Sequence, residues 1–402
     1  MSKFFGRHHI AIPGPSIMPD RVIRAINRPA PDIYDPELAE MVYGVINDLK
    51  IIAGTSGYAT IYICNGHGVW EGSIANLFSR GDKVLVLATG IFGSGWGGFA
   101  KALGIAVETM DFGKRNPVDT DRLVARLVQD KQHEIKAILV VHVDTSTSVR
   151  NDIKDIARAI KSLDHPALLA VDCIASLGCD NFCMDDWQVD VMVSGSQKGL
   201  MTPPGLGFIY FNERAREVGK KAKLRTPYWD WERRVNPEEF YQLFCGTAPT
   251  HHLFALREAL DMIVHEEGLE QVYKRHAVMA EAIWAAFDTW SSEGQVEMNI
   301  SDKNHRSHSV STIKMKSPNG KLLRKWTQEY SGLTLGIGLG METEQDPNST
   351  GYFRIGHMGH LNPNMILGLL GSIEAGFDHL KIRRGKGAIE AAAKVIANAQ
   401  LH

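Results

Sequence analysis

The chain has 402 residues, and 44 Lys and Arg against 46 Asp and Glu give a formal net charge of −2. This balance offers no general electrostatic reason to bind nucleic acid or an anionic membrane, and a hydrophobic fraction of 44% argues against a disordered chain. Five cysteines are too few for a disulfide scaffold, and no apolar run is long enough to span a bilayer. With no signal-peptide pattern at the N-terminus, we expect a cytoplasmic protein of two or three domains.

Short apolar segments alternate with segments of helical period between residues 58 and 212. They are apolar nearly throughout, which is typical of strands that are buried on both faces. The strands predicted are 59–64, 83–88, 105–110, 136–143, 167–172, 190–195 and 206–211. Residues 68–79 and 151–163 between them predict amphipathic helices. This alternation predicts an α/β fold with a mainly parallel sheet.

The pattern changes after about residue 215 and predicts a smaller α+β domain. Helices are expected at 251–267, 270–290, 319–330, 362–380 and 386–399, and strands at 295–300, 310–315, 333–338 and 352–357. The polar segment 340–352 is predicted to be an exposed loop. We therefore expect a large domain over 18–262 and a small domain over 263–402, with residues 1–17 packed against the small one.

Four places in the sequence carry residues suited to chemistry. Asn65, Gly66 and His67 lie between a strand and a helix, where backbone N–H groups bind phosphate. Asp172 ends a buried strand, and Lys198 lies in a turn of small residues. Arg354 could bind a carboxylate through two hydrogen bonds. Each also has a plain structural explanation: a simple turn, a structural salt bridge, a surface lysine and an inter-domain ion pair.

Taken together, a phosphate cup, an aspartate, a lysine and an arginine are the set that a pyridoxal phosphate enzyme requires. The aspartate keeps the pyridine nitrogen protonated, and the lysine carries the cofactor as an imine and then moves the substrate proton. The arginine orients the substrate carboxylate. No spacing of His, Cys, Asp or Glu in the sequence indicates a metal site.

The segments NGHGVWEG (65–72), SGSQKGLMTPPG (194–205) and RIGHMG (354–359) resemble those of class V aminotransferases of the alanine/serine–glyoxylate type. The resemblance implies a type I pyridoxal phosphate transferase fold and a homodimer with shared active sites. It also implies ping-pong transamination through a Lys198 aldimine. The amino donor would be serine, alanine or aspartate, and the acceptor a 2-oxo acid such as glyoxylate or pyruvate.

The resemblance assigns a role to each matching position. Lys198 and Asp172 match the catalytic pair, and Arg354 matches the substrate carboxylate ligand. The cofactor-binding positions that match are Asn65, Gly66, His67, Phe92, Thr145, Asp172, Ile174, Gln197, Lys198 and, donated by the neighbouring subunit, Thr247. Two positions depart from the family pattern, because Asn65 replaces the usual Ser of the cup and Phe244 replaces a Tyr.

Three alternatives remain open at this point. Several segments also resemble pyridoxamine–pyruvate aminotransferases, which have an arginine where Leu339 stands here and an acidic residue where His67 stands. The spacing Gly93-x-Gly95-x-x-Gly98 formally matches a dinucleotide fingerprint and would indicate an NAD-dependent oxidoreductase. The third alternative is a paralogue that binds pyridoxal phosphate without catalysis.

Overall fold

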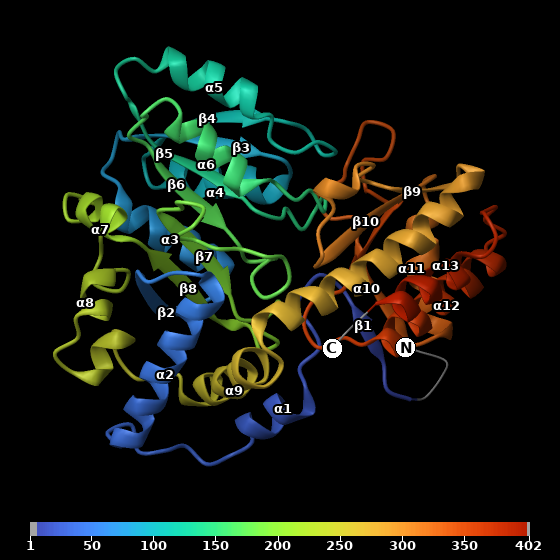
Figure 1. The fold of residues 1–402 in the computed structure, drawn as a ribbon, viewed down its shortest axis with the longest axis horizontal. Coiled ribbons are helices and arrows are strands. Elements are labelled where there is room, and N and C mark those ends of the chain that lie inside the picture. The colour runs from blue at the N-terminus through green and yellow to red at the C-terminus, as the bar shows by residue number, and fades with distance from the viewer. Residues whose placement is uncertain (1–5, 400–402) are drawn as a thin grey trace.

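Two β-sheets organise the chain in the computed structural model, which describes residues 6–399 (Figure 1). The larger sheet has seven strands, and only β8 runs antiparallel to its neighbours. Its order is β2 (Tyr58–Cys64), β8 (Gly205–Phe211), β7 (Val191–Gly195), β6 (Leu168–Asp172), β5 (Ile135–Val141), β3 (Lys83–Ala88) and β4 (Ala106–Asp111). The seven strands expected from the sequence and the mainly parallel sheet are therefore confirmed.

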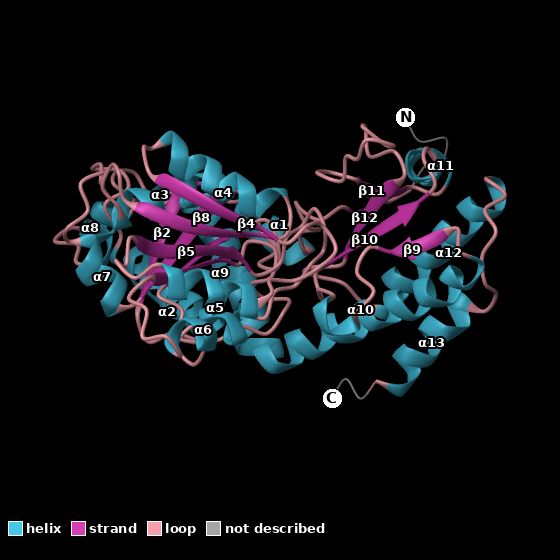
Figure 2. Ribbon diagram, turned by 90° about the horizontal axis from the view of Figure 1, so that it is seen from above, coloured by secondary structure: helices cyan, strands magenta, loops and turns pink. Residues whose placement is uncertain are grey.

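Helices cover both faces of this sheet, as Figure 2 shows from above. One face carries α3 (Gly66–Leu77) and α4 (Ile91–Ala102), and the other carries α2 (Pro36–Ala53), α5 (Thr120–Gln129), α6 (Ile153–Lys161) and α9 (Thr250–Leu260). Alternate residues of a strand enter different cores: Val84 and Val86 of β3 pack on one side, and Leu85 and Leu87 on the other. Burial of both faces explains why these strands are apolar throughout.

Shorter helices line the outside of this part of the chain. They are α1 (Asp20–Ile26), α7 (Glu213–Gly219), α8 (Trp231–Val235) and the 3₁₀ turn η1 (Phe240–Leu243). The sequence analysis did not predict α1 or α2. The helix expected over 251–267 is α9 followed by a π-helical segment, η2 (Asp261–Glu267).

The smaller sheet has the order β1 (His9–Ala11), β11 (Leu333–Ile337), β12 (Tyr352–Gly356), β10 (Val310–Met315) and β9 (Val296–Met298). Its helices are α10 (Leu269–Trp290), α11 (Asn319–Tyr330), α12 (Pro363–His379) and α13 (Ala388–Asn398), with 3₁₀ turns η3 (Ser291–Glu293) and η4 (Lys303–His305). The four expected strands are present, and the N-terminal β1 adds a fifth by pairing in parallel with β11. The domain boundaries at 18–262 and 263–402 stay a prediction.

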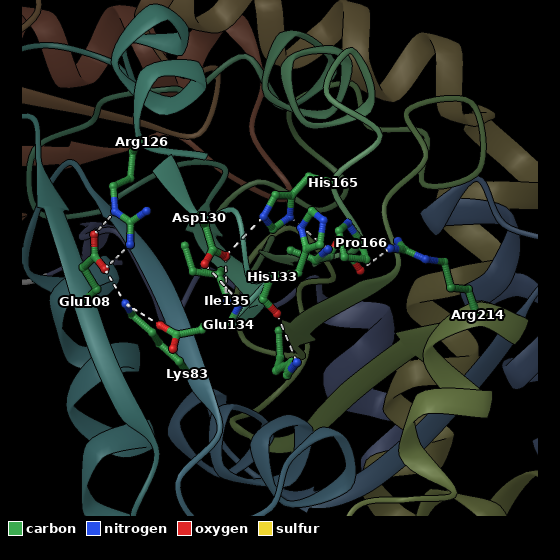
Figure 3. A network of polar contacts seen from close by, with 12 residues as sticks. Lys83, Glu108, Arg126, Asp130, His133, Glu134, Ile135, His165, Pro166 and Arg214 are labelled. Carbon is green, nitrogen blue, oxygen red and sulfur yellow. Dashed lines mark hydrogen bonds and ion pairs between the residues drawn. The ribbon is translucent and has the colours of Figure 1, made fainter. Parts of the chain in front are cut away.

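Ionic contacts tie together the amino-terminal side of the large sheet (Figure 3). Glu108 accepts hydrogen bonds from Nε and Nη2 of Arg126, the latter at 2.7 Å, and its carboxylate lies 3.1 Å from the Lys83 ammonium. The Nε2 atom of His165 lies 3.2 Å from a carboxylate oxygen of Asp130. Because Lys83 begins β3 and His165 precedes β6, this network leaves the opposite edge, where the parallel strands end, free for a ligand site.

The segment 340–352 is a loop, as expected, and residues 342–345 and 347–348 are exposed, but Asp346 between them is buried. Asp346 is 9% exposed, and its carboxylate accepts hydrogen bonds from the N–H groups of Gly351 and Thr350 at 2.7 and 2.9 Å. The hydroxyl of Ser317 donates to the same carboxylate at 3.2 Å. This largely polar loop is therefore ordered around one carboxylate.

None of the helices in residues 6–399 combines the length and hydropathy that a membrane crossing requires.

Candidate active site

A cavity of about 210 Å³ lies at the carboxyl-terminal edge of the large sheet. Nine of the eleven site residues expected from the sequence line it, although they come from separate strand ends and helix starts. They are Asn65, Gly66, His67, Phe92, Thr145, Asp172, Ile174, Gln197 and Lys198. These residues therefore lie at the edge where open parallel sheets bind ligands, and their roles stay a prediction.

Asp172 is the last residue of β6 and is 3% exposed. One carboxylate oxygen accepts the N–H of Ile174 at 2.7 Å, and the other accepts the indole N–H of Trp70 at 2.8 Å. Burial raises the pKa of Asp172 to about 7, while these two donors act in the opposite direction. The group is a fixed acceptor at the base of the cavity.

Lys198 follows β7 and is covered by the N-terminal segment 12–16. Its ammonium donates to the carbonyl of Pro13, and the hydroxyl of Ser16 donates to the Lys198 carbonyl at 2.7 Å. Gly14 has a φ of +96°, and a Cβ there would lie 2.6 Å from the Lys198 side chain, so only glycine fits. Burial and repulsion from Arg354 lower the pKa of Lys198 to about 8. A substantial fraction of this amine is therefore neutral near pH 8.

The start of α3 forms one end of the cavity. Asn65 caps the helix, because its side-chain oxygen accepts the N–H groups of His67 and Gly68 at 3.1 and 3.3 Å. The side-chain oxygen of Gln197 is buried without a hydrogen-bond partner in residues 6–399. A buried amide oxygen without a hydrogen-bond partner lowers the stability of the fold unless a ligand or a water donates to it.

Arg354 belongs to β12 of the small sheet and reaches the wall of the cavity. Its Nη1 donates to the carbonyl of Thr145 at 2.8 Å, and its Nε donates to the carbonyl of Ile337 at 2.7 Å. Nη2 has no hydrogen bond to any residue in the described range 6–399, so it is available to a carboxylate. Burial lowers the pKa of Arg354 to about 10, and the nearby Asp144 acts in the opposite direction.

Sequence reasoning missed two residues that hold the site together. Trp70 lies in the segment 68–79, for which only an amphipathic helix was predicted, yet its indole N–H donates to Asp172. Asp144 is fully buried and accepts the N–H groups of Phe92 and Gly93 at 3.0 and 3.3 Å. The available signal for Asp144 was an acidic residue directly after a buried strand, which is the same signal that singled out Asp172.

The glycine spacing at 93–98 does not form a dinucleotide site. In a dinucleotide-binding fold the first N–H groups of the helix receive the pyrophosphate. Here Asp144 occupies those of Phe92 and Gly93, and its negative charge would repel a phosphate. This geometry disfavours the NAD-dependent alternative.

Two further expectations concern residues outside the cavity and metal ions. Thr247 is exposed and does not line the cavity of its own chain, so its donation to a neighbouring subunit stays a prediction. In the part of the chain that the structure describes, no three His, Cys, Asp or Glu side chains are grouped as metal ligands.

Comparisons with known proteins agree with this arrangement. The profile of the family "Aminotransferase class-V" matches residues 50–342. The chain is 34% identical to a serine–glyoxylate aminotransferase of Methylorubrum extorquens, over 98% of this chain and 97% of that protein. It is 32% identical to an L-aspartate–glyoxylate aminotransferase of Paracoccus denitrificans, over 91% and 90% of the two chains.

A solved structure supports the same fold. Pyridoxamine–pyruvate aminotransferase from Mesorhizobium loti superposes with a TM-score of 0.88 at 25% identity, over 99% of both chains. The family profile covers more than half of the sequence, and relatives above 30% identity match nearly its whole length. With a lysine and an aspartate lining one cavity, and an arginine bonded to a carbonyl in its wall, the chain belongs to the class V aminotransferases, and the protein is an aminotransferase.

Proposed function

We propose that the protein uses pyridoxal 5′-phosphate to move the amino group of serine, alanine or aspartate to a 2-oxo acid such as glyoxylate or pyruvate. The observation that carries this proposal is that Asp172 and Lys198 line one cavity, while Arg354 donates to the carbonyl of Thr145 in the wall of that cavity. The serine–glyoxylate and aspartate–glyoxylate activities named for relatives at 34% and 32% identity support the substrate class.

The residues of the cavity fit this cofactor. Asp172 is a buried acceptor suited to a protonated pyridine nitrogen, and the unpartnered amide of Gln197 can turn its N–H toward a phosphate. Phe92 and Ile174 supply apolar surfaces for the two ring faces. When bound, pyridoxal phosphate supplies an aldehyde that condenses with amines and a ring that takes up electrons from Cα.

The protein's own groups then perform four tasks. Asp172 holds the proton on the ring nitrogen, and Lys198 binds the cofactor through its amine. With cofactor and amino acid bound, the Lys198 amine would act as the general base that takes the proton from Cα, a role that its pKa of about 8 suits. Arg354 orients the substrate carboxylate through its free Nη2. The same residues serve the reverse half-reaction with the 2-oxo acid.

A half-reaction screen tests this proposal. The cofactor-loaded protein is mixed with single amino acids, and loss of the imine absorbance is followed. We expect serine, alanine or aspartate to discharge the band and produce the matching 2-oxo acid, and Lys198→Ala to lose both the band and turnover. If Lys198→Ala keeps turnover and a borohydride-reducible band, the assignment is wrong; if no amino acid changes the band, the protein is a binder without catalysis.

Pyridoxamine is the second candidate donor, since the Mesorhizobium loti structure shares the fold over 99% of both chains. Leu339 and His67 stand where those enzymes have an arginine and an acidic residue, so this chain lacks two charges of that site. We therefore expect pyridoxamine to discharge the imine band of the cofactor-loaded protein poorly, and the same screen measures it beside the amino acids.

We further propose that the protein works as a homodimer in the cytoplasm, with a large domain over 18–262 and a small domain over 263–402. The exposed position of Thr247 supports the dimer, because this residue does not line the cavity of its own chain and is free to contact a neighbouring subunit. The separate apolar cores around the two sheets support the division.

A further inference from the structure

A second cavity, of about 690 Å³, lies between α11 and the loop 338–350 and shares no lining residue with the cofactor cavity. Three basic side chains of α11 line one wall: Lys321, Arg324 and Lys325. These positions lie three and four residues apart, so they share one face of the helix. The facing wall is the loop ordered around Asp346, and Glu342 is the one acidic residue among those lining the cavity.

Arg324 lacks the carboxylate partner that several other partly buried arginines of this protein have. Its only hydrogen bond within residues 6–399 is a long one, 3.5 Å from Nε to the carbonyl of Leu335, and no carboxylate in that range pairs with it. By contrast, Arg126 pairs with Glu108, and Arg275 pairs with Glu267 at 2.6 Å. Burial lowers the pKa of Arg324, because partial removal from water destabilises the charged guanidinium.

The opposite wall presents an unsatisfied hydroxyl. Ser349 is 4% exposed and lines the cavity, and its Oγ has no hydrogen-bond partner among the described residues. The loop fixes this residue, because the Ser349 N–H donates to the Asp346 carbonyl at 3.1 Å and its carbonyl accepts the Tyr352 N–H at 3.1 Å. A rigid hydroxyl and an unpaired guanidinium therefore line the same space.

The cavity is also adjacent to the substrate side of the active site. Arg354 donates on one side to Thr145, which lines the cofactor cavity, and on the other to Ile337, which lines this one. The positive charge of Arg324 acts on Arg354 and lowers its pKa. A negative charge in this cavity would offset that repulsion.

We propose that the cavity between α11 and the loop 338–350 binds a small dianion, of the phosphate or dicarboxylate class, through Arg324, Lys321 and the Ser349 hydroxyl. The site is separate from the position of the substrate carboxylate at Arg354. A bound dianion neutralises Arg324 and weakens the positive field at Arg354. It should therefore raise the KM of the anionic substrate by about two- to fivefold without a matching change in kcat.

Ligand titration of the cofactor-loaded protein tests this proposal, because the loaded protein has its phosphate cup already filled. Inorganic phosphate and succinate are titrated separately at constant ionic strength, with NaCl as the reference salt, and followed by calorimetry and by the melting temperature. We expect saturable binding of at least one dianion and no saturable effect of chloride. Phosphate alone, succinate alone, or both would identify the source of the shared chemistry.

Variants of the cavity separate this site from general ionic effects. Arg324→Gln should weaken binding at least tenfold, and Ser349→Gly, which suits the φ of +51° at this position, should weaken it by a smaller factor. If Arg324→Gln does not fold, the exposed Lys321→Gln gives the charge test instead. Arg158→Gln, an exposed arginine of α6, is the matched control and should bind as the wild type does. Unchanged affinity in Arg324→Gln, or in Lys321→Gln where that replaces it, would overturn the proposal, as would binding that does not saturate.

Discussion

Trp70 and Asp144 orient other residues of the candidate site, although no sequence motif assigned a role to either of them. Trp70 fixes one oxygen of Asp172 from the first turns of α3. Asp144 caps the start of α4 and so holds Phe92 at the edge of the cavity. Gly90 is required beside it, since a Cβ there would lie 2.3 Å from the Asp144 carboxyl carbon. Both residues orient other groups.

Trp70→Phe is expected to lower kcat about tenfold, because a hydrogen bond to a charged group contributes about 1.5–3 kcal/mol. The indole N–H lowers the pKa of Asp172, so its loss should raise that pKa above its value of about 7. Less carboxylate is then present at neutral pH, so the rise of activity with pH should have a higher midpoint than in the wild type. The measurement is a kcat–pH profile.

Trp96→Phe is the matched control for this variant. Trp96 stacks near Trp70, with ring centroids 6.4 Å apart, and its own indole N–H has no partner in residues 6–399. Removing that N–H should leave the kcat–pH profile unchanged from the wild type. Equal profiles for the two variants would show that Trp70 acts through packing alone.

Arg354→Gln should shift the titration of Lys198 upward. Repulsion from Arg354 contributes to the lowered pKa of the lysine, so removing the charge lets the pKa rise above about 8. Only the neutral amine reacts with an aldehyde. The rate at which the cofactor-free protein captures pyridoxal phosphate, measured against pH, should therefore have a higher midpoint. Arg158→Gln serves as control, and an unchanged or lower midpoint in Arg354→Gln would contradict this account.

At the scale of elements, the loop 340–352 shows how one buried carboxylate can order a polar segment. Asp346 accepts hydrogen bonds from two backbone N–H groups of the following turn and from the hydroxyls of Ser317 and Thr350. These donors lower its pKa, although burial alone would raise it. The turn signals in the sequence predicted a loop but not this centre.

Asp346→Asn is expected to loosen the loop, because an amide presents two donors where the carboxylate accepted only. An unsatisfied buried donor costs about 1–3 kcal/mol. Limited proteolysis and hydrogen exchange over residues 342–350 should both become faster, while the melting temperature changes little. Glu344→Gln, at an exposed position of the same loop, should not change either rate. If the two variants behave alike, the loop is not held by Asp346.

At the scale of the molecule, the proposed shared active sites have a direct test. Thr247→Glu would bring a negative charge to the phosphate of the neighbouring subunit, and Lys198→Ala removes the amine within its own subunit. Each variant alone should be nearly inactive. In a mixed dimer one cavity carries both changes and the other carries neither. Mixing the two unfolded variants and refolding them together should therefore restore about a quarter of wild-type activity, and no recovery would argue against shared sites.

Sequence patterns determined most of the secondary structure, because hydrophobic periodicity is a local property. The strands of the large sheet and the helix over 319–330 are where the sequence predicted them. Helix α2 was not predicted although its buried residues recur with a helical period, because it precedes the strand–helix alternation, which begins at residue 58. Strand β1 was missed because three residues carry too little period to detect.

The sequence by itself determined the fold class and the residue types of the site, since strand ends and buried ionisable groups can be read along the chain. Only the tertiary structure decided which groups touch. Trp70 and Asp172 are 102 positions apart, and Arg354 and Thr145 are 209 apart. Such contacts depend on how the sheets and helices pack, which no local pattern specifies. The cavity beside α11 likewise depends on tertiary packing, because Arg324 of a helix and Ser349 of a loop line it together.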